Sequence, residues 1–73
     1  MSLLFAEDGK EYSIQRISGS IEIRKHLADL GFRIGEFIRV ITHNKGNYIV
    51  SVQNVRVALG KDMASKVWIV PGE

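Results

Sequence analysis

The sequence predicts a mainly β fold: a small closed barrel of five short strands, with one short α-helix between the first and second strands. Three observations support this prediction. Segments with alternating apolar residues, typical of strands, recur along most of the chain, and only one segment has helical periodicity. The connections between these segments are tight and contain glycine or asparagine. So small a sheet removes its exposed edges by closing on itself, which favours a barrel.

Length and composition place the chain among soluble globular proteins with a single domain, residues 1–73. The absence of cysteine excludes disulfides and thiolate metal ligands. No apolar run approaches the ~20 residues of a membrane helix, and the first ten residues lack the pattern of a signal peptide, so we expect a cytoplasmic protein. The net charge of +2 is only a mild bias toward anionic partners.

The first strand is expected over residues 11–17, where Tyr12 and Ile14 alternate on one face after a turn-like Asp8-Gly9 pair. The helix is expected over residues 21–30. Its apolar residues recur at i, i+4 and i+7, which places them on one face of a helix, and Gly19 or Ser20 can cap its start. These apolar residues are Ile23, Leu27 and Leu30.

Two glycines explain how the chain leaves this helix. Gly31 follows the last periodic residue, where a left-handed conformation ends a helix without steric cost. Phe32 is then placed to fold back onto Leu27, the apolar contact that accompanies such helix ends. Gly35 serves the turn into the strand predicted over residues 37–41.

The remainder of the chain predicts strands and turns. Gly46 is expected to supply a positive φ in the hairpin over residues 43–47. The segment GKDMAS is too short for more than a single helical turn. The inward-facing residues expected in the two strands after the hairpin, over residues 48–52 and 55–59, are Tyr48, Val50, Val52, Val55, Val57 and Leu59. A last strand, residues 66–70, is ended by Pro71 and Gly72.

The stretches LADLGFRIGEFIRVI and VRVALGKDMASKVWIV carry a resemblance to the FeoA family of small bacterial ferrous-iron-transport proteins. The likeness runs from about residue 10 to the last strand and rests on the order and spacing of its elements. Two loop positions depart from the pattern, because Asn47 replaces a proline and Asn54 a glycine. The matching residues are Leu27, Leu30, Gly31, Gly35, Ile38, Val40, Gly46, Val57, Ala58, Leu59, Ala64, Val67 and Ile69.

The resemblance implies an SH3-like barrel that acts in the cytoplasm beside FeoB, the membrane ferrous-iron transporter with a GTP-binding domain. It implies a non-enzymatic accessory protein without a cofactor. Nucleic acid is not expected as a partner, and a homo-oligomer is left open. The barrel also resembles the C-terminal domain of DtxR-type metal-dependent repressors. Repressor function is excluded for this chain alone, because it has no room for a helix-turn-helix. The structural motif comprises Leu27, Leu30, Gly31, Phe32, Gly35, Gly46, Leu59 and Ala64.

Chemical sites are weakly indicated. His26 lies four residues after Glu22 and three before Asp29, so His26 and Asp29 are weak candidates for metal ligands. Exposed polar helix residues have the same spacing, and imidazole ligands normally come in clusters, so no metal site is predicted. The sequence contains no Ser-His-Asp arrangement, cysteine nucleophile or phosphate-binding loop, which opposes an enzyme.

A surface for a protein partner is the stronger prediction. Strand alternation directs Trp68 and Phe37 outward unless the N-terminal Leu-Leu-Phe segment or the helix covers them. An uncovered Trp68 would indicate a homodimer or a protein partner, because tryptophan is enriched at the centres of interfaces. Binding of nucleic acid, or a stand-alone module of a metal regulator, is the alternative function. Against it, basic and acidic residues are interleaved without a basic stripe. The residues assigned to partner binding are Arg24, Lys25, Leu27, Ala28, Arg33 and Trp68.

Overall fold

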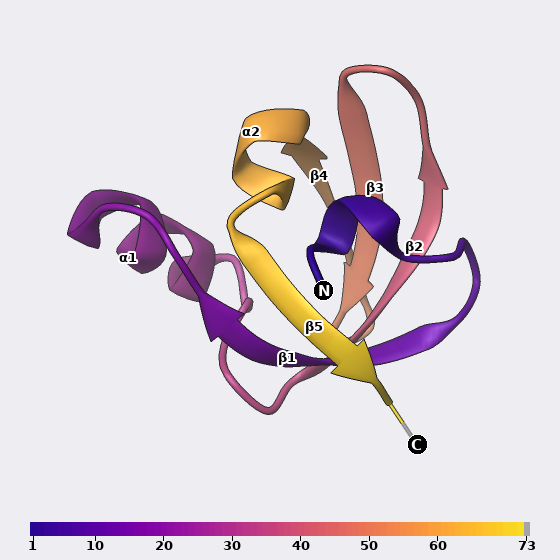
Figure 1. Cartoon of the computed structure of the whole chain (residues 1–73), viewed down its shortest axis with the longest axis horizontal. Helices are drawn as coiled ribbons and strands as arrows, with labels where there is room; N and C mark the ends of the chain where they lie inside the picture. Colours follow the sequence, from indigo (N-terminus) through magenta and orange to yellow (C-terminus); the bar gives the residue numbers. More distant parts are fainter. Residues whose placement is uncertain (73) are drawn as a thin grey trace.

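A computed structural model describes residues 1–72 and contains one antiparallel sheet of five strands, ordered β4-β3-β2-β1-β5. The sheet curls into a small barrel, and the helix α1 projects from its side (Figure 1). The mainly β prediction, with a helix between the first two strands, is confirmed. In chain order the elements are η1 (Leu3–Phe5), β1 (Glu11–Ile17), α1 (Ile21–Asp29), β2 (Phe37–His43), β3 (Asn47–Val52), β4 (Val55–Gly60), α2 (Lys61–Ala64) and β5 (Val67–Pro71).

Every strand contributes residues to one apolar core, which lies inside the curl of the sheet. Side chains alternate between the two faces of a strand, so the residues that the sequence places inward are largely the buried ones. Tyr12 and Ile14 are buried as predicted, and so are Tyr48, Val50 and Val52. The rest of the core cluster consists of Leu3, Ala6, Leu27, Phe32, Ile38, Val40, Leu59, Ala64, Val67 and Ile69.

Two register shifts bend the sheet. One lies in β1 between Ile14 and Arg16, and the other lies in β2 between Val40 and Thr42. Such irregularities bend the strand that contains them and increase its local twist. The strand β1 consequently pairs with β2 through its first residues and with β5 along its length. Within residues 1–72 no ladder joins β4 to β5, so the predicted closure of the barrel is not made by strand pairing.

The N-terminal segment enters the core. Leu3 is fully buried, and the Ile69 N–H donates a hydrogen bond of 2.7 Å to the Met1 carbonyl. The alternative that the Leu-Leu-Phe segment covers the outward aromatic residues is therefore wrong for Phe37, which is 53% exposed. Phe5 of the same segment is itself 74% exposed. A short 3₁₀ turn thus supplies one core leucine, which no periodicity in the sequence could indicate.

The helix α1 begins and ends as predicted. The Ser20 hydroxyl accepts a hydrogen bond of 3.2 Å from the Ile23 N–H, which caps the first turn. Gly31 has a φ of 103°, and its N–H donates to the Ala28 carbonyl, while the Phe32 N–H donates to the Leu27 carbonyl at 2.9 Å. This pair of bonds is the Schellman arrangement of a helix end.

Gly31→Val is expected to lower the free energy of unfolding by about 1–2 kcal/mol or more, because a β-branched residue rarely adopts a positive φ. A Cβ at this position would lie 3.4 Å from the Gln53 Oε1 atom, an ordinary contact, so the backbone conformation is the cause. Chemical denaturation measures the effect. Gly46→Val is the control, because no atom lies within 4 Å of a Cβ built there. Equal midpoints for the two variants would contradict this account of Gly31.

Two predictions about the turns and strands are wrong. Gly46 has no positive φ; the hairpin is instead held by the Asn44 side chain, whose Oδ1 accepts hydrogen bonds from the N–H groups of Gly46 and Asn47. Val55 is not an inward core residue but 59% exposed, because it lies at the tip of the β3–β4 hairpin, beyond the cover of α2. In that hairpin Asn54, which replaces the glycine of the family pattern, adopts the left-handed region with a φ of 63°.

Candidate functional site

The helix α1 and the turn after it carry three exposed basic residues, next to the exposed acidic residues Glu22 and Asp29 of the same helix. The helix stands away from the barrel, and its attachment comes from the buried Leu27 with the partly buried Ile23 and Leu30 (Figure 1). Arg24 and Lys25 are exposed on the helix, and Arg33 is exposed on the turn that follows it. The structure thus places three of the predicted partner-binding residues at the surface in and beside one projecting element.

Leu27 and Ala28, which were also assigned to partner binding, are less exposed than these basic residues. Leu27 has no exposed surface, so its assignment to partner binding is wrong: it fixes the helix to the core and cannot touch another molecule. Ala28 is half-buried. The bond between the Phe32 N–H and the Leu27 carbonyl lies beneath the surface, because Phe32 is also buried. Leu27 and Phe32 at the helix exit therefore have a structural role.

Two isoleucines that sequence reasoning missed supply the exposed apolar surface. Ile21 is 71% exposed at the start of α1, and Ile34 is 72% exposed just after Arg33. Ile21, Lys25 and Ala28 are spaced i, i+4 and i+7, so they share the helix face opposite Leu27. That spacing was a usable signal, because an isoleucine outside the apolar stripe of an amphipathic helix has no core to enter. We call Ile21, Arg24, Lys25, Ala28, Arg33 and Ile34 the helix surface.

Trp68 is held by its own chain on β5. The indole Nε1–H donates to the Ser18 hydroxyl at 3.4 Å, and the Arg16 guanidinium lies 5.0 Å from the ring centre. Both Arg16 and Trp68 belong to facing strands, where they pair directly across the sheet. The side chain points away from the core as predicted, but it is only half-exposed. It is therefore a poorer candidate for a partner contact than the helix surface.

The outer face of the sheet holds a shallow cleft of about 340 Å³. Phe37 and Ile41 line it, as expected for residues that oppose Ile38 and Val40 on β2. Glu36 also lines the cleft, and its carboxylate accepts a hydrogen bond of 3.2 Å from the Gln53 side chain. The mixture of opposite charges and amides gives this cleft no single ligand chemistry.

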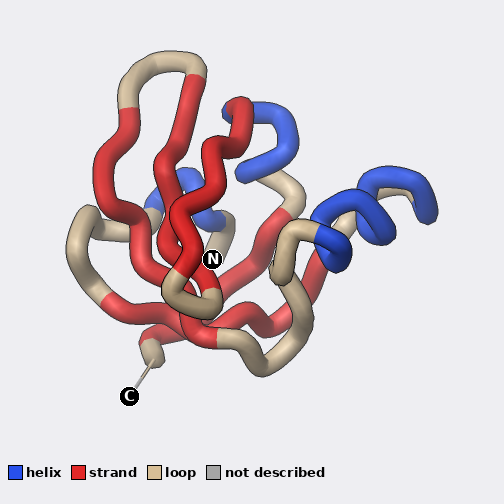
Figure 2. Tube along the Cα trace, turned by 180° about the vertical axis from the view of Figure 1, so that it is seen from behind, coloured by secondary structure: helices blue, strands red, loops and turns tan. Residues whose placement is uncertain are grey.

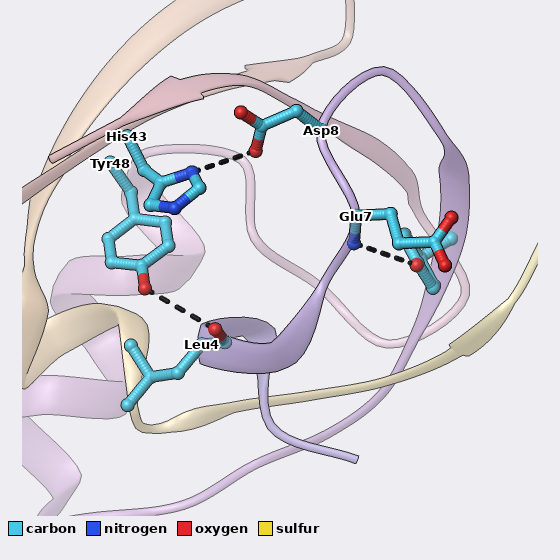
Figure 3. A network of polar contacts seen from close by, with 6 residues as sticks. Leu4, Glu7, Asp8, His43 and Tyr48 are labelled. Carbon is cyan, nitrogen blue, oxygen red and sulfur yellow. Dashed lines mark hydrogen bonds and ion pairs between the residues drawn. The ribbon is translucent and has the colours of Figure 1, made fainter.

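The two histidines lie far apart. His26 is exposed on α1, whereas His43 lies at the end of β2 on the other side of the barrel (Figures 1 and 2). The His43 Nδ1 atom is 2.8 Å from the Asp8 carboxylate, and its ring stacks on that of Tyr48 (Figure 3).

The contacts around His43 tie the N-terminal segment to the β2–β3 hairpin. The Tyr48 hydroxyl donates to the Leu4 carbonyl at 3.4 Å, beside the Asp8–His43 pair. Nearby, the Glu7 N–H donates to the Tyr12 hydroxyl at 3.0 Å (Figure 3). Asp8 and His43 are both more than two-fifths exposed, and a polar contact this exposed contributes little to stability. These contacts thus mainly hold the N-terminal segment in position against the β2–β3 hairpin.

We expect the protein to bind divalent transition metals weakly. Across residues 1–72 no three His, Asp or Glu side chains gather as metal ligands, and imidazole and carboxylate ligands bind such metals tightly only in clusters. Calorimetry with Fe²⁺ and Mn²⁺ measures the affinity. Sub-micromolar binding that His26→Ala abolishes would contradict the expectation and would restore His26 with Asp29 as ligands.

Comparison with known proteins agrees with the sequence motifs. A protein of Methanocaldococcus jannaschii assigned as Fe(2+) transport protein A is 28% identical over 97% of this chain and 87% of its own length. The crystal structure of an iron uptake regulatory protein (FeoA) is 32% identical, covers 97% of this chain and 95% of that one, and superposes with a TM-score of 0.86.

The comparison extends to repressors. A manganese-dependent transcriptional repressor shares the fold with a TM-score of 0.89 and 24% identity, but this chain spans only 41% of its length. In the part of the chain that the structure describes, no helix is long and apolar enough to cross a membrane. The FeoA domain model matches residues 1–71, nearly the whole sequence. The chain belongs to the FeoA domain family.

Proposed function

We propose that this chain is a non-enzymatic accessory protein of ferrous iron uptake that docks on the cytoplasmic side of a FeoB-type transporter and modulates transport. Membership of the FeoA domain family supports a role in iron uptake. The name of the archaeal relative, an Fe(2+) transport protein, points the same way.

The observation that carries the docking part is the helix surface. Its basic side chains, Arg24, Lys25 and Arg33, are exposed without a salt bridge to any residue in 1–72. The exposed isoleucines, Ile21 and Ile34, stand beside these charges in the sequence. A surface that joins apolar contact to basic charge fits an acidic protein surface, where charge speeds the encounter and apolar contact slows dissociation.

A pull-down tests the proposal directly. The purified protein is presented to the cytoplasmic domains of the transporter, with and without guanine nucleotide, and capture by the native chain is expected. Ile21→Ser with Ile34→Ser should weaken capture, because it removes exposed apolar surface without touching the core. Circular dichroism should show an unchanged fold for this variant.

A matched control separates the helix surface from other exposed apolar groups. Phe5→Ser with Phe37→Ser removes comparable exposed residues from elsewhere in the molecule and should leave capture unchanged. Absence of capture by the native chain in every nucleotide state would overturn the docking proposal. Equal loss in both variants would locate docking outside the helix surface.

A further inference from the structure

The two edge strands of the sheet are treated differently by the chain. The outer edge of β5 is covered by the N-terminal segment: the Met1 ammonium donates to the Ile69 carbonyl at 2.9 Å, and Ser2 pairs with Trp68 as an isolated bridge. Pro71, which has no N–H group, ends the same strand. Both devices are typical protection against pairing with another chain.

The other edge, β4, has no such protection. It pairs with β3 at every position from Val55 to Gly60 without a register shift, and it contains no proline. Seen from behind, β4 lies at the front of the molecule and leads into α2 (Figure 2). Val55, Arg56 and Ala58 are exposed along it.

The direction of the β4 backbone groups follows from the hairpin. A two-residue turn, Gln53-Asn54, joins β3 to β4, and such a turn is flanked by a hydrogen-bonded pair, here Val52 and Val55. Antiparallel bonding alternates along a strand, and the Lys61 N–H bond of 3.0 Å to the Gly46 carbonyl keeps that alternation. The N–H and C=O groups of Arg56 and Ala58 therefore point away from β3.

No described residue hydrogen-bonds to these outward groups of Arg56 and Ala58. An unpaired row of backbone donors and acceptors on a regular strand is a template for a further strand. The strand that could add here must be extended, must tolerate Arg56, and must bring apolar side chains to Val55 and Val57 on the inner face.

We propose that the β4 edge pairs in antiparallel fashion with β4 of a second copy of this chain, with the two-fold axis at Val57. At this register Arg56 lies opposite Ala58 of the partner subunit, so the two guanidinium groups avoid each other. A register centred on Arg56 would set like charges directly opposite, which destabilises a strand pair. In this two-fold contact both subunits contribute the same strand, which closes the dimer.

The same register improves burial. Val57, half-buried in one copy, lies opposite Val57 of the partner subunit, and Val55, 59% exposed, lies opposite Leu59 of the partner subunit. Residues directly opposite in an antiparallel pair have adjacent side chains, so both valines gain apolar contact. The dimer thus explains why an apolar residue, Val55, is exposed in the single chain. This proposal stands independently of transporter docking.

Sedimentation equilibrium of the purified chain over a concentration series tests it, and a reversible monomer–dimer equilibrium is expected. Ala58→Glu should tighten the dimer about three- to ten-fold, because each new carboxylate faces Arg56 of the partner subunit. Ala58→Lys, the matched variant, should weaken the dimer by a similar factor. Ala58 is exposed, so neither variant should alter the thermal unfolding of the monomer much.

The decisive variant exchanges the charges. Arg56→Glu combined with Ala58→Lys should restore dimerisation relative to Ala58→Lys alone, because opposite charges again face each other across the two strands. Arg56→Glu combined with Ala58→Glu is the control for net charge: its net charge of −1 equals in size the +1 of the exchanged variant, but like charges face each other, so it should stay monomeric. Ala58→Pro should abolish the dimer, because it removes an outward N–H while the bonds to β3 remain. A chain that stays monomeric throughout, including with Ala58→Glu, would overturn the proposal, as would a dimer indifferent to all these substitutions.

Discussion

Arg24→Glu combined with Arg33→Glu is expected to abolish transporter-dependent iron uptake in cells while the protein stays folded. Both side chains are exposed, and exposed charges contribute little to stability. The change takes the net charge from +2 to −2, since each substitution subtracts two charges. A surface that attracts an acidic partner then repels it, which slows association and weakens the bound state. Uptake of radioactive iron by cells that depend on this protein measures the effect.

The control variant makes the same change in net charge at a different place on the surface. Lys45→Glu with Lys61→Glu alters two exposed residues, Lys45 at the tip of the β2–β3 hairpin and Lys61 at the start of α2, whose N–H donates to the Gly46 carbonyl. This variant should support normal uptake. Normal uptake by a stably expressed Arg24/Arg33 double variant would contradict the assignment of the helix surface and direct attention to Trp68 and the outer face of the sheet.

Phe32→Ala is expected to cost about 3–5 kcal/mol of folding free energy, because it empties a large site in the core. Phe32 is 1% exposed and follows the glycine that ends α1. A domain of this length has a total stability of about 4–11 kcal/mol at the usual stability per residue. The variant should therefore be largely unfolded at physiological temperature, as measured by chemical denaturation and by the dispersion of amide NMR signals.

Phe37→Ala is the matched substitution five residues later. Phe37 is 53% exposed on the outer face, so the same loss of atoms should cost about 1 kcal/mol or less. Similar unfolding midpoints for the two variants would show that the helix exit does not fix Phe32 in the core. The comparison separates burial from the identity of the residue.

Local patterns in the sequence were sufficient for most of the fold. Alternation identified the strands, and the spacing of Leu27 and Leu30 with the following Gly31 identified the helix and its end. These features depend on contacts between residues close in the chain, where periodicity is informative. The family motif uses the same residues, and the FeoA domain model matches residues 1–71.

Features that depend on distant contacts were not predictable. The burial of Leu3 follows from a bond between Met1 and Ile69, and the exposure of Val55 follows from its place on an edge strand. The prediction of a positive φ at Gly46 was wrong because hydrogen bonds to the Asn44 side chain hold the hairpin instead. At the candidate site, the assignment of Leu27 to partner binding was wrong because a residue of the family motif can be required only for the core. Ile21 was overlooked, although its position outside the apolar stripe of the helix was a usable signal in the sequence.

The pairing of β1 with β5 has a consequence for the synthesis of the protein. Ile14 on the first strand lies opposite Ile69 on the last, and both are almost completely buried. A nascent chain can form the local meander of β2, β3 and β4 early, but it cannot complete its core until residue 71 has left the ribosome. Such long-range closure is the slow step for folds rich in non-local pairing. The domain therefore cannot complete its fold before β5 has emerged, and its first strand must wait, unpaired along one edge, for the last to arrive.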